Sequence, residues 1–200
     1  MNGIMHFRVQ NKNPLYDYRE ACKVTQGIDM FNQDMPVFKP KDEVEFWIKQ
    51  IVANHSTLRC IHFRLIDKRP KSVIMQLIRA TKGHPQPEVE SSRPDWTGKR
   101  RSTDPYELKL FMQDHTAESF IEMAKQRLCM RTEENTRNTM REMVEALKES
   151  KDPFLKAVGY CCHPHCWWLH GCPEIKSCNP QATKVADSII RMYNYVEKMF

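Results

Sequence analysis

Cysteine and histidine are concentrated in one short segment near the end of this 200-residue chain. Five of the eight cysteines lie in CCHPHCWWLHGCPEIKSC, between residues 161 and 178, and the others are scattered at positions 22, 60 and 129. Disulfide frameworks are typical of small secreted proteins, whereas a tight cluster in a reducing compartment favours metal. The segment predicts a closed, structural zinc site formed by Cys162, Cys166, Cys172 and Cys178.

The irregular spacing of these cysteines leaves alternatives open. His163 or His165 offers a substitute ligand, because imidazole and thiolate bind zinc equally well in closed sites. A Cys172–Cys178 disulfide or a set of buried thiols would also account for the cluster.

Composition indicates a globular protein that attracts anions. Hydrophobic residues make up 40% of the chain and charged residues 28%, which excludes wholesale disorder and low-complexity filaments. The 31 Lys and Arg against 25 Asp and Glu give a net charge of +6, which favours phosphate-bearing ligands. Neither a membrane-spanning apolar stretch nor a signal-like start is present. We therefore expect no membrane association and a cytoplasmic location, which is the host cytoplasm if the chain is viral.

Hydrophobic periodicity predicts an α+β fold in which helices dominate and the sheet is small and antiparallel. We expect this domain over residues 1–158, a Cys/His-rich segment over 159–180 and a C-terminal helix over 181–200. The first 40 residues are predicted as strand and loop, and a strand is expected around 61–66. The other apolar patterns predict helices over 41–54, 70–81, 106–113, 116–128 and 132–150.

Standard nucleotide and hydrolase motifs are absent, since the chain has no GxGxxG, Walker A, GxSxG or HExxH sequence. Gln76 and Arg79 are three residues apart on one helix face, and the following polar loop carries Ser91 and Arg93. Together these groups suit a phosphate. A solvated basic loop is the simpler interpretation of the same residues.

The order of these features resembles the core of flavin-dependent thymidylate synthases. In that family a helix ends in His, a strand follows, and a helix of the form QxxRHR leads to a Ser-x-Arg loop. The matching stretch here is KDEVEFWIKQIVANHSTLRCIHFRLIDKRPKSVIMQLIRATKGHPQPEVESSRPDW. The similarity continues through TAESFIEMAKQRLCMRTEENTR and CWWLHGCPEIKSC, the latter similar to a cysteine-bearing tail of some bacterial members. It covers about 140 of the 200 residues, from Lys41 to Cys178.

The resemblance implies a binding role for residues at matching positions. It implies that the substrate, a pyrimidine deoxynucleotide, is bound by Gln76, Arg79, Glu90, Ser91, Arg93 and Arg137, of which Arg137 reads the base. It implies that FAD is bound by His55, Ser56, Thr57, Thr81 and Arg127.

The implied reaction is alkylation at C5 of dUMP or dCMP, by methylation or hydroxymethylation. Methylenetetrahydrofolate would donate the carbon and NADPH the reducing equivalents. No protein nucleophile is expected, so no residue is assigned a catalytic role. The resemblance also implies a homotetramer with active sites between subunits.

The chain departs from the family pattern at three motifs. The family's RHR reads Arg79-Ala80-Thr81, its Glu-His pair reads Arg59-Cys60, and its Asn-Ala-Arg reads Thr116-Ala117-Glu118. These changes favour a divergent member, such as a viral enzyme that makes a modified DNA precursor. The alternative from another class is a non-catalytic, zinc-stabilised nucleotide- or nucleic-acid-binding protein on the same scaffold.

Overall fold

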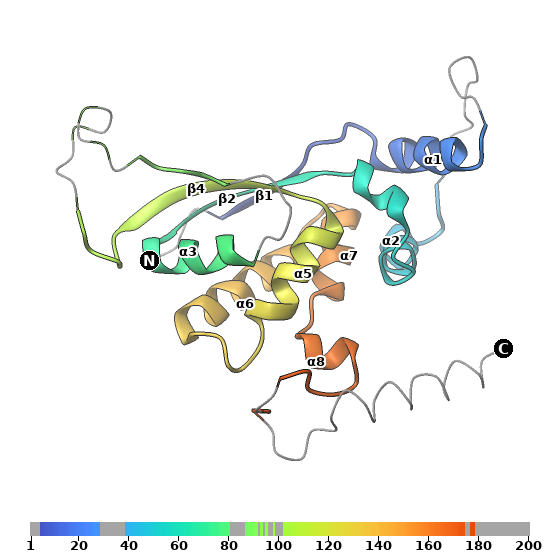
Figure 1. Cartoon of the computed structure of the whole chain (residues 1–200). Coiled ribbons are helices and arrows are strands. Elements are labelled where there is room, and N and C mark those ends of the chain that lie inside the picture. Colours follow the sequence, from blue (N-terminus) through green and yellow to red (C-terminus); the bar gives the residue numbers. More distant parts are fainter. Residues whose placement is uncertain are drawn as a thin grey trace.

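The structure is a computed structural model that describes residues 5–28, 39–80, 87–91, 93, 95, 98, 102–174, 177 and 178. Within these residues the protein is an α+β domain with one antiparallel sheet of four strands, in the order β1-β2-β4-β3 (Figure 1). The strands are β1 (His6–Val9), β2 (Phe63–Pro70), β3 (Glu88–Val89) and β4 (Leu108–His115). The predicted α+β class with a small antiparallel sheet is confirmed.

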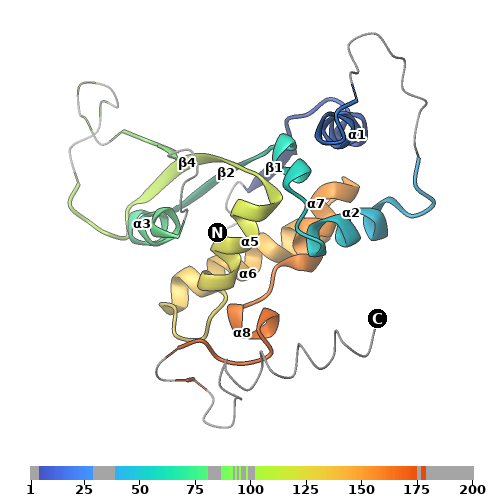
Figure 2. The same cartoon turned by 45° about the vertical axis from the view of Figure 1, so that its right-hand side comes forward.

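Helices pack against one side of this sheet. Figures 1 and 2 show α3, α5 and α6 on the same side, with α2 and α7 next to them and α8 farthest from the strands. The helices in the described residues are α1 (Pro14–Thr25), α2 (Glu43–Val52), α3 (Lys71–Arg79), α5 (Ala117–Arg127), α6 (Glu134–Lys148), α7 (Pro153–Cys161) and α8 (His165–Trp168), with a short 3₁₀-helix η1 (Ser56–Cys60). None of them is both long and apolar enough to cross a bilayer.

Side-chain caps fix where several helices begin. Asp42 accepts a hydrogen bond of 2.9 Å from the Glu45 amide at the start of α2. At the start of α5, the Ser119 amide donates to the Thr116 hydroxyl and the Thr116 amide donates to the Ser119 hydroxyl. Asp152 caps α7, in which Pro153 is the first residue. Each cap satisfies amide groups that the first turn of a helix leaves without partners.

Aromatic contacts join the helices to the sheet. Phe63 of β2 lies 5.6 Å from Phe120 of α5 and 6.4 Å from Phe154 of α7, measured between ring centroids. Trp47 of α2 meets Phe154 edge-on at 5.2 Å. All four side chains are fully buried, so one continuous core holds α2, α5, α7 and the sheet in place.

The predicted helix over 106–113 is wrong, because this segment forms strand β4. It pairs antiparallel with β2, from Phe63 opposite His115 to Pro70 opposite Leu108. Its buried residues alternate, at positions 109, 111, 113 and 115. The apolar residues at 108, 111 and 112 also fit a helical repeat, but pairing with β2 decides the conformation.

Three further helices were not predicted, one of which is the short α8 in the Cys/His-rich segment. Residues 14–25, expected as strand and loop, form α1, which Pro14 begins and Asn13 caps through the Tyr16 amide at 3.2 Å. Helix α7 runs across residue 158, the predicted end of the main domain. Strand β2 and helices α2, α3, α5 and α6 confirm the other predicted elements, while the predicted helix over 181–200 lies outside the described residues.

Gly159 provides a test of how closely α7 approaches α6. A Cβ at this position would lie 2.8 Å from the Lys148 amide nitrogen and 2.9 Å from the Leu147 Cβ. We predict that Gly159→Ala lowers the free energy of unfolding by about 1–3 kcal/mol, measured by urea denaturation, because backbone atoms cannot move aside easily.

Tyr160→Ala, on the exposed side of the same helix, is the control and should change stability by less than about 0.5 kcal/mol. Helix propensity alone would make Gly159→Ala stabilising by about 1 kcal/mol, so a gain in stability would contradict this packing.

Candidate functional site

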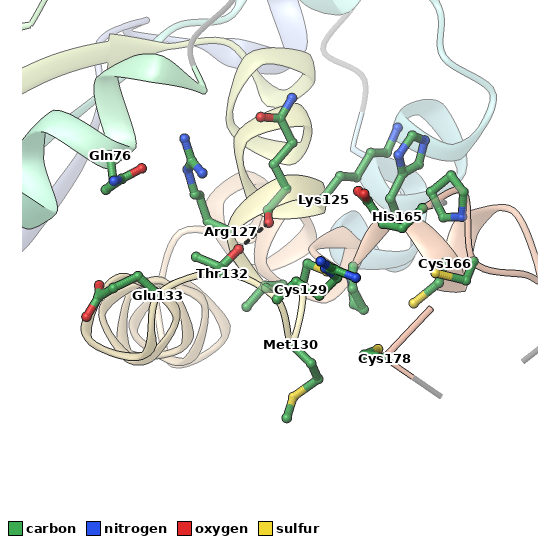
Figure 3. Close-up of a pocket in the computed structure, with 17 residues that line it drawn as sticks. Gln76, Lys125, Arg127, Cys129, Met130, Thr132, Glu133, His165, Cys166 and Cys178 are labelled. Atoms are coloured by element: carbon green, nitrogen blue, oxygen red, sulfur yellow. Dashed lines mark hydrogen bonds between the residues drawn. The ribbon is translucent and has the colours of Figure 1, made fainter. Parts of the chain in front are cut away.

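A pocket of about 650 Å³ lies between α3, the turn that joins α5 to α6, and the segment after α7 (Figure 3). Gln76 comes from α3, Arg127 from the end of α5, and Thr132 from the turn, while His165 and Cys166 come from α8. This volume is in the range of pockets that bind small molecules and cofactors.

The α5–α6 turn is held rigidly by hydrogen bonds to its own backbone. Arg137 of α6 donates from Nη1 to the carbonyl oxygens of Met130 and Thr132, at 2.9 and 3.1 Å. The Thr132 hydroxyl donates to the Gln126 carbonyl at 2.8 Å. The turn therefore has a fixed shape, and so does the pocket wall that it forms.

Arg127 presents a guanidinium group suited to an anion. Figure 3 shows its side chain extending toward Gln76, and its Nε is buried without a hydrogen-bond partner. Burial lowers the pKa of Arg127, and the neighbouring positive charge of Arg79 lowers it further. A phosphate here would neutralise two adjacent guanidinium groups and satisfy the buried donor.

Two of the predicted substrate and flavin residues, Gln76 and Arg127, thus line the same pocket, and Arg79 interacts electrostatically with Arg127 without lining it. Arg137, the predicted reader of the base, lies behind the same pocket. Its Nη1 is engaged by the two turn carbonyls, and its Nε is buried without a partner. In this structure Arg137 therefore holds the backbone of the turn in place.

The other predicted phosphate contacts lie away from this pocket, on the β3 side of the sheet. Glu90 donates its amide to the Leu110 carbonyl at 2.8 Å and so extends the pairing of β3 with β4. Ser91 accepts the Arg93 amide at 3.1 Å, and Arg93 forms a 2.7 Å ion pair with Asp95. None of these residues lines the pocket within one chain, and Thr81 lies outside the described residues.

A second pocket of about 240 Å³ adjoins the first. His55, a predicted flavin contact, lines it together with Trp168 and Lys125. Lys125 lines both pockets, and its Nζ lies 5.0 Å from the centre of the Trp168 ring. Ser56 and Thr57 line a third, more open pocket, so the predicted flavin contacts are not gathered in one place within a single chain.

Arg59 and Glu118 form a two-pronged ion pair at the edge of the second pocket. Arg59 Nε lies 2.7 Å from one Glu118 carboxylate oxygen, and Nη2 lies 3.2 Å from the other. These are the positions at which the thymidylate synthase pattern has Glu and Arg, respectively. The ion pair connects η1 to the start of α5.

The predicted zinc ligands are not brought together as a set. Cys162 packs in the hydrophobic core, where burial strongly raises the pKa of its thiol. Cys166, Cys172 and Cys178 instead line the large pocket, and the fourth thiol beside them belongs to Cys129. Burial raises the pKa of Cys166, and the Cys129, Cys172 and Cys178 thiols raise it further.

Among the described residues, no three Cys, His, Asp or Glu side chains are already gathered as metal ligands. Sequence reasoning missed Cys129 because it is 37 positions before Cys166 in the printed sequence. Its one sequence signal is that it follows Arg127, a predicted flavin contact, by two residues.

No model of a known protein family matches the chain, and no curated protein matches it.

Arg127→Met tests the anion pocket. We predict that it weakens binding of inorganic pyrophosphate about 10- to 150-fold, the loss expected for charge-assisted hydrogen bonds worth about 1.5–3 kcal/mol. Without a ligand the variant should be at least as stable as the wild type, because it removes an unsatisfied buried donor beside Arg79. Calorimetric titration and thermal unfolding measure the two effects.

Arg8→Met, on the exposed side of β1, makes the same change in charge and is the control. If both variants weaken pyrophosphate binding equally, the effect is one of net charge and the assignment to Arg127 is wrong.

Proposed function

We propose that the protein is a flavin-dependent enzyme that alkylates C5 of a pyrimidine deoxynucleotide monophosphate, dUMP or dCMP. The group transferred is a methyl or hydroxymethyl group, and its carbon comes from methylenetetrahydrofolate. The proposal rests on the resemblance to flavin-dependent thymidylate synthases, and the features below support it.

The observation that carries the proposal is the contact between Arg59 and Glu118. These two positions are 59 residues apart in the sequence, and the resemblance alone pairs each with a family residue of opposite charge. Arg59 and Glu118 attract each other in this chain whatever the alignment, so their opposite charges alone are no test of it. The contact supports the proposal because it brings the two motif positions together beside His55, a predicted flavin contact.

The large pocket supports the choice of a phosphate-bearing substrate. Arg127 and Gln76 supply a guanidinium group and an amide on the pocket wall, and the positive charge of Arg79 lies near Arg127, which together suit the phosphate of a nucleotide or the pyrophosphate of a dinucleotide. The turn anchored by Arg137 keeps Arg127 at this wall, so the site is organised before the ligand arrives.

FAD is compatible with the residues on the adjoining pockets. His55 and Lys125 border the smaller pocket, Lys125 and Arg127 the larger one, and the unpaired Nε of Arg127 suits the negative charge of the cofactor's pyrophosphate. The bound flavin, reduced by NADPH, would supply the hydride needed for methylation. The protein's own groups bind the nucleotide, orient its base and restrict water.

A homotetramer would complete the site. Ser91, Arg93 and Glu90 lie on the β3 side, away from the pocket of their own chain, so in this proposal they contact the nucleotide held by another copy. The sheet offers a surface for such contact, because Leu108 and Leu110 of β4 are exposed and alternate along the strand with its buried residues. Exposed leucines in an unpaired sheet face favour association.

One observation favours a non-catalytic nucleotide-binding protein as the second candidate. Ala80 stands where the family motif has histidine, and its methyl group is buried with 1% exposure. The polar group at that position is therefore missing, while the arginines that suit phosphate are present. A protein of this kind would bind the nucleotide and not the flavin.

Charge reversal tests the proposal with FAD binding as the readout. We predict that the purified protein binds FAD and that Arg59→Glu and Glu118→Arg each weaken this binding several-fold, because each places like charges together beside His55. The double variant, which restores the family's arrangement, should recover binding and thermal stability. Quenching of FAD fluorescence measures the affinity.

Lys49→Glu reverses a charge in an exposed ion pair on α2 and is the control, with no expected change in FAD binding. Absence of FAD binding by the wild type would refute the flavin-dependent proposal and favour the binding protein. If the double variant does not recover FAD binding, the contact between Arg59 and Glu118 no longer supports the alignment.

A further inference from the structure

We propose that Cys129, Cys166, Cys172 and Cys178 form a structural zinc site that ties the α5–α6 turn to the segment after α8. These four thiols line the same pocket, and Figure 3 shows Cys129, Cys166 and Cys178 on the side opposite Gln76. Four thiolates satisfy the tetrahedral preference of Zn²⁺ and leave no position open for substrate. The site differs by one ligand from the set that the sequence predicts.

Cys166 is the centre of the group, because its thiol interacts electrostatically with each of the other three. The thiols line the pocket without being drawn into a coordination shell, as expected for a site whose ligands close around the metal when it binds.

Backbone geometry brings Cys172 back toward Cys166. The Gly171 amide bonds to the Cys166 carbonyl at 3.0 Å, and His170 just before it adopts a left-handed conformation with φ of 50°. This is the arrangement that ends a helix and reverses the chain. The two cysteines are therefore held at the two ends of one tight turn.

Hydrogen-bond donors are also directed at Cys172. Its sulfur accepts bonds from the Ser177 side chain and from the backbone amides of Glu174 and Cys178. Donors of this kind orient a metal-binding thiolate and stabilise its charge. They also bring residues 177 and 178 close to Cys172, and the Cys178 thiol interacts electrostatically with Cys166.

Cys162 does not fit this group. It is buried with 3% exposure in the core that α7 forms, and its electrostatic neighbours are Cys161 and Lys148. Coordination by Cys162 would require this side chain to leave the core. Cys129 needs no such change, because it lies in the turn that already forms the pocket wall.

Basic groups around the pocket compensate the charge of such a site. Four thiolates and one Zn²⁺ carry a net negative charge, and Lys125, Arg127 and Arg131 also line the pocket. The metal would hold the same turn that carries Arg127, so it would stabilise both walls of the anion pocket.

The test compares two ligand variants of the full chain with a control variant, Cys162→Ala, all prepared under reducing conditions with zinc present. Elemental analysis should find about one zinc per chain in the wild type and in Cys162→Ala. Cys129→Ala should lose zinc, with affinity lowered more than about 100-fold in competition with a chelator, since even partners outside the metal's ligand shell are worth 10- to 100-fold. Cobalt in place of zinc should give the absorption bands of a tetrahedral tetrathiolate site.

Cys178→Ala is the second variant, because Cys178 is exposed and its loss does not disturb the core. It should also lose zinc, even if Cys129→Ala fails to fold. A wild type without metal, a Cys172–Cys178 disulfide in reducing conditions, or full zinc affinity in either of these two variants would overturn the proposal. Loss of zinc in Cys162→Ala, with Cys129→Ala unaffected, would assign the site to the other set.

Discussion

The hydrogen bonds from Arg137 fix the α5–α6 turn, which forms the wall of the large pocket between Arg127 and Cys129. One guanidinium nitrogen binds two turn carbonyls, from Met130 and Thr132, and so fixes a segment that has no regular structure of its own. The bond to Met130 is exposed and the bond to Thr132 is half-buried, so the contribution of the pair is to fix the two carbonyls relative to each other. The rigid turn then determines where Arg127, on one side, and Cys129, on the other, point into the pocket.

This arrangement separates two kinds of chemistry within one cavity. Arg127 and its neighbours Arg79 and Gln76 form a basic end suited to phosphate. The four cysteines line the other end, where a metal would stabilise the wall without contacting the substrate. The proposed metal and the proposed nucleotide thus share a structural element but use different ligands, so each is tested independently.

The sequence predicts elements with strong local signals and fails where distant contacts decide. Asp42 and Thr116 cap helices that apolar periodicity also predicts. In β4 the apolar residues fit both a helix and a strand, and only pairing with β2, whose partner residues are 38 to 52 positions earlier, selects the strand. Helices α1 and α7 each begin with Pro after an Asn or Asp cap, which is a helix-start signal that outweighs the loop interpretation of such residues.

The same distinction holds for the candidate site. Gln76 and Arg79 lie on one helix, and their common face follows from spacing alone. The contacts of Arg127 with Arg79, of Arg59 with Glu118, and of Cys129 with Cys166 join segments distant in sequence. Sequence spacing carries no information on such contacts. For that reason the sequence-based prediction of zinc ligands included Cys162, which is close to the other cysteines along the chain but buried in the core.

Release of the hydrogen at C5 tests the central claim most directly. The purified protein would receive FAD, NADPH, methylenetetrahydrofolate and either dUMP or dCMP labelled with tritium at C5. Alkylation replaces the C5–H bond with a C–C bond, so the account predicts transfer of tritium to water from one of the nucleotides and not from its nucleoside. A folded protein that binds pyrophosphate but releases no tritium from either nucleotide would contradict the account.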